Sequence, residues 1–559
     1  MAAAQIPRNA FRLLIMKRNH KTTGAAALVD SLAKAGVETI FGYPGGNVID
    51  IFDELAASGI GFVLGRHEQG CVHMADGYAR ASGRPGVAVV TSGPGLTNTI
   101  TGLGAANMDG VPLVLVCGQV PLPQIGTDAF QEADTTGLTR GVSKHNFLVH
   151  RADEIPETVA QAFYIATHGK PGPVVIDIPR DVQRALTAAV YPERVVLRSY
   201  HPESTASTAQ VNRLAKMINE AKRPVFFAGG GVIASGAAED VARLSRKAGI
   251  PVVTTMMGIG SVDGHDPLSL GMAGMHGNAC ANRALAQADL IVALGVRFSD
   301  RVTGEPSAFA GHARIVHVDI DPASIDKNIR VDMGIVADVK DLLTTVDSRV
   351  KSASRSAWLR TVAGWKEKFA AALAADLGDT SVSPAAVVDA VCRACDGDVI
   401  IATDVGQHQL WATRHLRCVY PRHFITSGGM GAMGFGIPAA IGAAIARPGH
   451  KVVSLVGDGG AQMTFQELIV AAELDLPVTF VVFKNSSLGL VRQMQRQDFG
   501  GRYFATDLRS PDFLKLASAY GIKAERVTGP GDLEAAVFKA VRSRRPFLLE
   551  VEIDKEVEA

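Results

Sequence analysis

The stretch that decides the fold is VSLVGDGGAQMTFQELIVAAELDLPVTFVVFKNSS, from Val453 to Ser487. An apolar run typical of a strand ends at the GDG triplet around Asp458, a helical segment follows, and a second apolar run ends at Lys484-Asn485. This order predicts two parallel strands joined by a crossover helix. Because ligands bind at the carboxyl ends of parallel strands, we expect Asp458 and Asn485 to converge at one edge of the sheet.

These two side chains have the chemistry of a magnesium site. A carboxylate and an amide supply hard oxygen ligands, and Mg²⁺ prefers few protein oxygens together with the phosphates of a ligand. The flanking Gly457 and Gly459 let backbone N–H groups approach a phosphate at the start of the helix. A lone aspartate at a strand end is commonly a helix cap. The GDG triplet with an asparagine 27 residues beyond Asp458 instead predicts a metal–diphosphate site.

The composition is that of a globular protein with several domains. A chain of 559 residues is too long for one hydrophobic core, so about two to four domains are expected. Lys plus Arg (56) nearly balance Asp plus Glu (55), which excludes a strong field for nucleic acid or anionic lipid and favours a small-molecule partner. No apolar run reaches the length of a membrane span. We expect a cytoplasmic protein with reduced cysteines, because nothing in the sequence completes the lone CxxC of Cys392 and Cys395 as a metal site.

Alternating strand and helix patterns predict three parallel sheets with helices on both faces. A linker rich in Pro and Ser separates the first series from the second, and a polar helical stretch separates the second from the third. The first twenty residues are basic, as in a targeting peptide or an over-long start before Met16. The predicted division is an N-terminal extension 1–22, a first domain 23–190, a central domain 191–345, a linker helix 346–382 and a last domain 383–559.

The first and last series resemble each other. Each contains a helix of small residues, an Arg-Pro-Gly turn, a strand, a G-x-G, a helix, a proline and another strand. Gly95 and Pro112 are 17 residues apart in the first copy, and Gly459 and Pro477 are 18 apart in the second. This spacing predicts two domains of one ancestry. The alternative is that any two units of this type look alike.

The GDG triplet, 24 intervening residues and then KN resemble the metal–diphosphate signature of thiamine-diphosphate enzymes. By this resemblance Asp458, Asn485 and the backbone carbonyl of Ser487 would hold Mg²⁺. Lys484 stands where the family usually has a first asparagine, a departure that spares the ligand. GRHEQGCVHMADGYAR in turn resembles a segment of the same enzymes in which a glutamate, here Glu68, hydrogen-bonds the aminopyrimidine ring and promotes loss of the thiazolium C2 proton. From the residues alone, Glu68 could equally be a structural ion-pair partner of Arg66 or His67.

Within this superfamily, the chain from about Thr23 to Asp554 is most similar to the acetohydroxyacid (acetolactate) synthases. The segments that match in order include FGYPGGNVIDIFDEL, TSGPGLTNTITGL, GQVPLPQIGTDAFQEAD, KPGPVVIDIPRDVQ, HVDIDPASIDKN, TDVGQHQLWA and TSGGMGAMGFGIPAAIGA. The resemblance implies three doubly wound α/β domains, thiamine diphosphate with Mg²⁺, and a largely structural FAD. It also implies decarboxylation of pyruvate, transfer of the two-carbon unit to a second 2-oxo acid, a homodimer or homotetramer, and a small regulatory subunit as a further partner.

The resemblance assigns a role to particular residues. Phe130 and Gln131 would line the reaction pocket, and Arg301 would bind the carboxylate of the second 2-oxo acid with its guanidinium fork. Met433 would support the bent cofactor, although Met433 and Met275 are equally consistent with core filling. The other expected cofactor-binding residues are Gly45, Gly46, Gln407, His408, Gly431, Gly457 and Gly459 for thiamine diphosphate, and Gly229, Gly230, Met275, His276, Arg297 and Asp319 for FAD.

Several positions near the acceptor site depart from the family pattern. Met494 stands where the family usually has a tryptophan that favours 2-oxobutanoate; the other departures are Asn47, Lys170, Arg180, Ser299 and Asp498. A thiamine-dependent decarboxylase or acyl transferase with another 2-oxo acid or acceptor is therefore the alternative activity. An inactive cofactor-binding regulator is disfavoured because Glu68, Asp458 and Asn485 are all present. A nicotinamide dehydrogenase built on the Gly-rich turn after Phe227 lacks a clear downstream acid.

Overall fold

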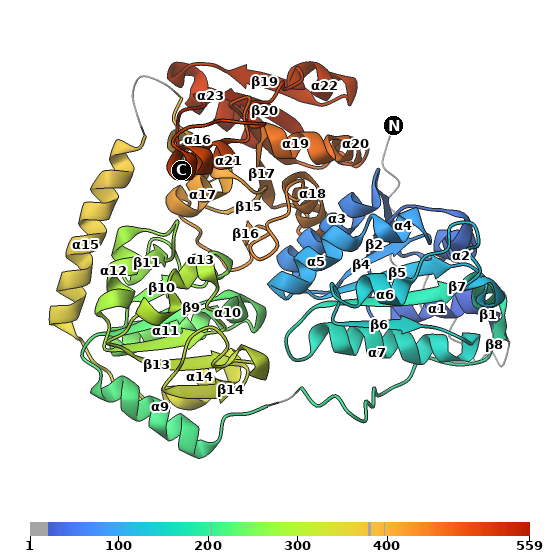
Figure 1. Cartoon of the computed structure of the whole chain (residues 1–559), viewed down its shortest axis with the longest axis horizontal. Coiled ribbons are helices and arrows are strands. Elements are labelled where there is room, and N and C mark those ends of the chain that lie inside the picture. The colour runs from blue at the N-terminus through green and yellow to red at the C-terminus, as the bar shows by residue number, and fades with distance from the viewer. Residues whose placement is uncertain (1–20, 203, 378–381, 396) are drawn as a thin grey trace.

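The computed structural model describes residues 21–202, 204–377, 382–395 and 397–559. Within them, three six-stranded parallel sheets form three lobes, which Figure 1 shows in blue, green and orange-red. The predicted α/β class with three doubly wound parallel sheets is therefore confirmed. The predicted extension 1–22 lies almost wholly outside the described residues. No described helix combines the length and the apolar character needed to cross a membrane.

The N-terminal sheet has the strand order β3-β2-β4-β5-β7-β6. Its central strands are buried apolar runs, as expected for a parallel sheet covered on both faces. The strands are β2 (Thr39–Gly42), β3 (Gly61–Leu64), β4 (Gly86–Val90), β5 (Leu113–Gln119), β6 (His145–Leu148) and β7 (Pro173–Pro179). The helices are α1 (Gly24–Lys34), α2 (Ile49–Ser58), α3 (Glu68–Ser82), α4 (Pro94–Thr97), α5 (Ile100–Asp109), α6 (Thr135–Thr139), α7 (Ile155–Thr167) and α8 (Arg180–Arg184). The short strands β1 (Thr22–Thr23) and β8 (Leu186–Thr187) pair separately.

The central sheet has the order β11-β10-β9-β12-β13-β14. Counted within the domain this is 3-2-1-4-5-6, the order of dinucleotide-binding folds. The strands are β9 (Pro224–Ala228), β10 (Val252–Thr254), β11 (Ser269–Met272), β12 (Leu290–Leu294), β13 (Arg314–Asp319) and β14 (Met333–Val336). The helices are α9 (Thr208–Glu220), α10 (Gly230–Ala234), α11 (Ala238–Ala248), α12 (Ala279–Gln287), α13 (Asp300–Thr303) and α14 (Val339–Asp347).

The C-terminal sheet has the order β16-β15-β17-β18-β20-β19. Counted within each domain, this order and that of the N-terminal sheet are both 2-1-3-4-6-5, which supports the predicted repeat. The strands are β15 (Val399–Thr403), β16 (Phe424–Ile425), β17 (Lys451–Gly457), β18 (Val478–Lys484), β19 (Lys523–Val527) and β20 (Phe547–Glu552). The helices are α16 (Pro384–Ala394), α17 (Gln407–His415), α18 (Gly436–Ala446), α19 (Asp458–Thr464), α20 (Leu468–Glu473), α21 (Gly489–Phe499), α22 (Phe513–Ala519) and α23 (Pro530–Val541).

Helices α3 and α18 join the N- and C-terminal sheets into one hydrophobic core (Figure 1). Helix α18 is apolar on every side, GIPAAIGAAIA, and is buried from Gly436 to Ala444. Glycines allow the close crossing: a Cβ on Gly77 would lie 2.2 Å from the carbonyl oxygen of Ala439, and one on Gly442 would lie 1.9 Å from that of Met74. The repeated domains therefore pack through their helices, not edge to edge.

The polar stretch predicted as one linker helix is interrupted. Helix α14 ends at Asp347, and α15 runs from Ser356 to Ala375 along the outside of the molecule (Figure 1). Arg355, which directly precedes α15, is held in a non-helical conformation with a φ of 40°. The guanidinium donates hydrogen bonds to backbone carbonyl oxygens of Ala221 and Ile218 at 3.1 and 2.5 Å.

Candidate active site

Asp458 lies where the sequence places it, as the first residue of α19 directly after β17. It is 1% exposed. One carboxylate oxygen accepts the N–H of Gly459 at 3.1 Å, and the other accepts the N–H of Ser486 at 2.8 Å and the hydroxyl of Ser510 at 2.7 Å. Burial raises the pKa of Asp458, and the hydrogen bond from Ser510 is the largest of those that oppose the rise. The carboxylate is thus held in one orientation at the helix start.

The Asn485 loop lies beside Asp458, as expected from the neighbouring strands. Strands β17 and β18 pair in parallel with Gly457 opposite Phe483, so their carboxyl ends coincide. The hydrogen bond from Ser486 to Asp458 joins the two loops directly. The side-chain oxygen of Asn485 accepts the N–H of Ser487 at 3.0 Å. The structure therefore brings the predicted oxygen ligands to one edge of the C-terminal sheet.

Lys484, the departure from the family pattern, has a clear structural partner. Its ammonium group lies 2.9 Å from Glu550 and 3.4 Å from Glu552, both on the adjacent strand β20. The positive charge of Lys484 is therefore directed toward these carboxylates on β20. The position of Asn485 is set by the backbone at the end of β18.

His408 lies against the GDG triplet, and Gln407 lies beside Gly489 next to the Asn485 loop. Both are buried at the start of α17, and the Oε1 atom of Gln407 and the Nε2 atom of His408 have no hydrogen-bond partner among the described residues. Burial lowers the pKa of His408 to about 3, so its ring is neutral at physiological pH. A Cβ on Gly457 would lie 3.0 Å from the His408 ring, whereas glycine leaves the backbone accessible. Buried polar atoms without a partner beside glycine backbone fit the binding of a polar ligand.

Asp404 is a positioning residue that the sequence reasoning missed. It follows β15, is fully buried, and accepts the N–H groups of Gly434 and Gly436 at 3.1 and 2.9 Å. These bonds fix the loop of Gly431 and Met433 against the site, and a Cβ on Gly459 would lie 3.7 Å from the Met433 methyl group. Burial raises the pKa of Asp404 to about 6. Its position after a predicted strand, in the quoted TDVGQ segment, was the available signal.

Glu68 is the first residue of α3 at the carboxyl edge of the N-terminal sheet. His67 caps this helix by accepting the N–H of Gln69 at 3.1 Å, which leaves the half-buried Glu68 side chain free to turn toward the sheet edge. Its carboxylate accepts a hydrogen bond from the Asn98 amide at 2.9 Å. Asn98 was also missed; it follows the short helix α4. The alternative was an ion pair with Arg66 or His67. Arg66 instead pairs with Glu473 at 2.5 Å, and the His67 ring accepts the N–H of Gln69.

Other predicted residues of the first domain gather around Thr91 and Gly93 at the same edge. A Cβ on Gly45 would lie 2.5 Å from the Thr91 side chain, and Gly46 follows at the start of the next turn. Gln131 has a φ of 61° and its backbone packs on Gly93. Phe130 beside it is 88% exposed.

The predicted flavin residues lie at two places in the central domain. Gly229 and Gly230 follow β9 and Asp319 ends β13, the two strands on either side of β12, so all three lie at one sheet edge. A Cβ on Gly229 would lie 2.1 Å from the carbonyl oxygen of Gly295. Met275 and Arg301 form a second group, with the Arg301 guanidinium 3.4 Å from the Met275 sulfur. Both side chains are well exposed, and burial, followed by the charge of Arg301, lowers the pKa of His276.

Arg297 has a structural partner in addition to its predicted role. Its guanidinium lies 3.7 Å from Asp109 of the first domain. The Asp109 carboxylate also pairs with Arg80 at 2.9 Å and accepts the N–H groups of Gly428 and Gly429 at 2.9 and 2.7 Å. A single buried carboxylate thus joins all three domains.

The two halves of the predicted site belong to different domains of the chain. Across the described residues, no hydrogen bond or ion pair connects Glu68 with the loops of Asp458 and Asn485. Large apolar side chains near both halves are exposed instead, including Phe130 (88%), Met463 (54%) and Phe504 (83%). Met494 on α21 is 38% exposed, and Asn47 donates a hydrogen bond to Ser92 at 2.7 Å. Exposed apolar groups of this size mark surfaces that bind a partner or ligand.

Comparison with known proteins agrees with this arrangement. Three models of the thiamine pyrophosphate enzyme family match the chain: the N-terminal TPP binding domain over residues 22–138, the central domain over 211–346 and the C-terminal TPP binding domain over 404–551. The first model contains Glu68 and the third contains Asp458 and Asn485.

Full-length relatives give the finer assignment. The chain is 44% identical over 544 residues to a probable acetolactate synthase large subunit of Methanocaldococcus jannaschii, covering 95% of this chain and 92% of the relative. It is 42% identical over 546 residues to the acetolactate synthase large subunit of Haemophilus influenzae, covering 96% and 95%. The mitochondrial acetolactate synthase catalytic subunit of Saccharomyces cerevisiae is 41% identical over 557 residues, covering 96% and 81%. With this similarity over nearly its whole length, the chain belongs to the acetolactate synthase large (catalytic) subunits of the thiamine pyrophosphate enzyme family.

Proposed function

We propose that the chain decarboxylates pyruvate and transfers the resulting two-carbon unit to a second 2-oxo acid, giving 2-acetolactate. The observation that carries the proposal is the placement of Glu68 and of Asp458 with Asn485 at the carboxyl edges of two sheets of identical strand order. One edge offers a carboxylate for proton chemistry and the other offers hard oxygens for a metal and a diphosphate. These two edges fall in the two domains whose relatives bind thiamine pyrophosphate.

The described residues fit thiamine diphosphate and Mg²⁺. Asp458, Asn485 and the Ser487 carbonyl would hold the metal, because all three offer the oxygen ligands that Mg²⁺ prefers. The remaining cofactor contacts would come from the glycine turns and from the unpartnered polar atoms described above: Gly45, Gly46, Gln407, His408, Gly431, Met433, Gly457 and Gly459. Helix α19 would contribute the positive end of its dipole toward the diphosphate.

The bound cofactor would supply a carbanion able to attack the carbonyl carbon of a 2-oxo acid. Glu68 would hold a proton in a hydrogen bond with the pyrimidine ring, and Asn98 would keep the Glu68 carboxylate in position. Arg301 would bind the carboxylate of the second 2-oxo acid as a planar fork. Phe130 and Gln131 would exclude water from the reacting atoms.

We propose a structural FAD in the central domain. The support is the 3-2-1-4-5-6 strand order and the Gly-rich turn after β9, where Gly229 packs closely on the backbone of Gly295. Gly230, Met275, His276, Arg297 and Asp319 would complete its binding site. An absorbance spectrum of the purified protein, before and after heat release of bound flavin, tests this assignment.

The catalytic unit that we propose is a homodimer or a dimer of dimers. Exposed Phe130, Met463 and Phe504 beside the two half-sites favour completion of each site by a second copy. A small regulatory subunit is proposed as a further partner because the relatives are named large subunits. Sedimentation at assay concentration tests the dimer, and a catalytically active monomer would contradict it. A cytoplasmic location stays a prediction.

Product analysis by mass spectrometry tests the function itself. Purified chain would receive pyruvate, Mg²⁺ and thiamine diphosphate, alone and with a panel of 2-oxo acids and aldehydes. We expect 2-acetolactate as the main product from pyruvate. Turnover of pyruvate without any acetolactate would instead favour the alternative decarboxylase or acyl transferase. The argument for that alternative is Met494, which stands where the family usually has a tryptophan.

A further inference from the structure

Three polar residues lie at the edge of the C-terminal sheet opposite to the site of Asp458. Asp398, His423 and His450 each directly precede one of three adjacent parallel strands, β15, β16 and β17. The register places Val399 opposite Lys451, so the amino ends of these strands lie together. The sequence does not indicate this group, because its members are separated by 25 and 27 residues.

The geometry of the three side chains is that of a metal site. One ligand atom from each lies within 4.8 Å of those of the other two. The Nδ1 atom of His423 is 3.7 Å from an Asp398 carboxylate oxygen, too far for a hydrogen bond, and the rings of His423 and His450 have centroids 5.9 Å apart. Ligand atoms around a tetrahedral zinc are about 3.3 Å apart, given metal–ligand distances of about 2.0–2.1 Å. Small side-chain rotations would therefore bring all three into coordination.

His423 supplies a second, independent observation. Its side chain is 5% exposed. Its Nδ1 atom has no hydrogen-bond partner among the described residues, although buried polar atoms are usually paired. This unpartnered atom is directed at Asp398. A bound cation at this point would satisfy the ring and neutralise the carboxylate together.

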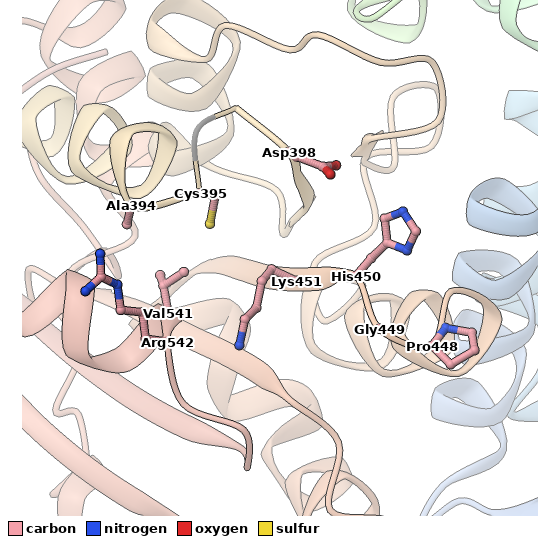
Figure 2. Close-up of a pocket in the computed structure, with 9 residues that line it drawn as sticks. All are labelled: Ala394, Cys395, Asp398, Pro448, Gly449, His450, Lys451, Val541 and Arg542. Atoms are coloured by element: carbon pink, nitrogen blue, oxygen red, sulfur yellow. The ribbon is translucent and has the colours of Figure 1, made fainter.

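We propose that Asp398, His423 and His450 bind a divalent transition-metal ion of the Zn²⁺ type. Two imidazoles and one carboxylate suit zinc, cobalt or nickel better than magnesium. The fourth position would face an open pocket of about 610 Å³ that Asp398 and His450 line, leaving room for water (Figure 2). The ion would tie three strand starts together, away from the catalytic edge.

Two nearby positive charges, Lys451 and Arg542, are directed away from this position, whereas a third, Arg447, acts on His423 electrostatically. Lys451 also lines the pocket, but its ammonium group donates a hydrogen bond to the Ser543 carbonyl at 2.8 Å. Figure 2 shows Lys451 extending away while the Asp398 carboxylate and the His450 ring approach each other. Arg542 lies on the far side of the same pocket (Figure 2). The competing interpretation is a simple ion pair between Asp398 and protonated His423.

The test uses the full-length protein, stripped with chelator and returned to excess Mg²⁺ so that hard-oxygen sites are filled. Zn²⁺ affinity is measured by competition with a chromogenic chelator, and Co²⁺ reports ligand geometry by its visible absorption. We expect one Zn²⁺ per chain, a four-coordinate Co²⁺ spectrum, and a rise in Tm with Zn²⁺. His450→Ala should weaken Zn²⁺ binding by more than about 100-fold, because even losses outside the ligand shell cost about 10–100-fold.

A matched pair of variants controls for surface charge. Asp398→Asn and Asp376→Asn each remove an exposed carboxylate that lies 3.7 Å from a buried histidine, His423 and His415 respectively. Only Asp398→Asn should lose Zn²⁺ binding, and both variants should keep the parent turnover with pyruvate. Equal Zn²⁺ affinity in the parent, His450→Ala and Asp398→Asn would overturn the proposal. So would a Zn²⁺ affinity in the parent no higher than that of the His450→Ala variant.

Discussion

The N-terminal and C-terminal sheets have the same strand order but different chemistry at one corresponding position. In each, a glycine directly precedes the first residue of the helix that comes after the third strand. That first residue is Pro94 in the N-terminal sheet and Asp458 in the C-terminal sheet. Proline has neither an N–H nor a ligand atom, whereas aspartate offers two oxygens at a helix N-terminus. One substitution at a shared position thus separates a half-site without a metal ligand from a half-site with one.

The sixth strands differ in a second way. Asp177 on β7 and Glu550 on β20 are both buried, and each strand pairs with the fourth strand of its sheet. Asp177 has neutral partners such as Gln119 at 3.1 Å. Glu550 instead binds Lys484 at 2.9 Å and Arg526 at 2.7 Å. The same architecture therefore tolerates an isolated buried carboxyl on one side and a compensated carboxylate on the other.

The largest effect is expected from Asp458→Ala. It removes one of two side-chain oxygens for Mg²⁺, so cofactor retention and activity should be abolished. Pro94→Ala at the corresponding position should retain cofactor binding, because it removes no ligand. Calorimetric titration with thiamine diphosphate and Mg²⁺ measures both. Full cofactor affinity in the Asp458→Ala variant would show that the two edges do not differ as described.

Glu68→Gln should reduce turnover by about 10²–10⁴-fold while leaving cofactor affinity nearly unchanged. The amide keeps the shape and the contact with Asn98 but cannot exchange a proton. The measurement is kcat alongside calorimetric cofactor affinity. A parent-level kcat in this variant would assign Glu68 a structural role only.

Met494→Trp tests the acceptor side of the C-terminal half. One methylene in an apolar pocket is worth about 1–3 kcal/mol, or roughly 10- to 200-fold in discrimination. We expect the parent to show little preference for 2-oxobutanoate over pyruvate and the variant to shift toward the 2-oxobutanoate product. Competition between equal concentrations of the two acceptors measures this ratio. A strong 2-oxobutanoate preference in the parent would contradict the prediction.

Asp177→Asn is expected to have the smallest effect, and it depends on pH. Burial raises the pKa of Asp177 to about 7 from an ordinary 3.8. The folded protein therefore binds this proton more tightly than the unfolded chain, and the contribution to stability is lost as pH rises from about 4 to 7. Asparagine does not ionise, so the Asp177→Asn variant does not lose this stability as pH rises. Its amide replaces a carboxyl group whose Oδ1 atom has no hydrogen-bond partner among the described residues.

Above pH 7 we expect the Asp177→Asn variant to gain about 1–3 kcal/mol in unfolding free energy over the parent, and less at pH 5. Glu550→Gln should instead destabilise at pH 7, because Lys484 and Arg526 would lose a charged partner. Denaturant unfolding of the parent and both variants at pH 5 and 8 measures the difference. A gain in unfolding free energy that is the same at both pH values would show that ionisation of Asp177 is not its cause.

The sequence by itself determined the three parallel sheets and the position of Asp458 beside the Asn485 loop. Apolar runs, Gly turns and the GDG-to-KN spacing depend on neighbouring residues, so they can be read along the chain. They led to three parallel sheets, the repeat, and the meeting of Asp458 with the Asn485 loop. That Lys484 leaves the Asn485 ligand in place stays a prediction, and the partners of Lys484 on β20 could not be named from the sequence.

Only the tertiary structure decided how these units meet. The α3–α18 crossing, the Asp109 junction, the Asp404 hydrogen bonds and the group at Asp398 join segments that are far apart in sequence. Their existence depends on whether two folded surfaces match in shape to within an ångström and whether each buried polar atom finds a partner. Local sequence patterns carry no information about that match. An apolar helix such as α18 can pack against many surfaces, and the glycines that face each other in α3 and α18 allow this particular close crossing.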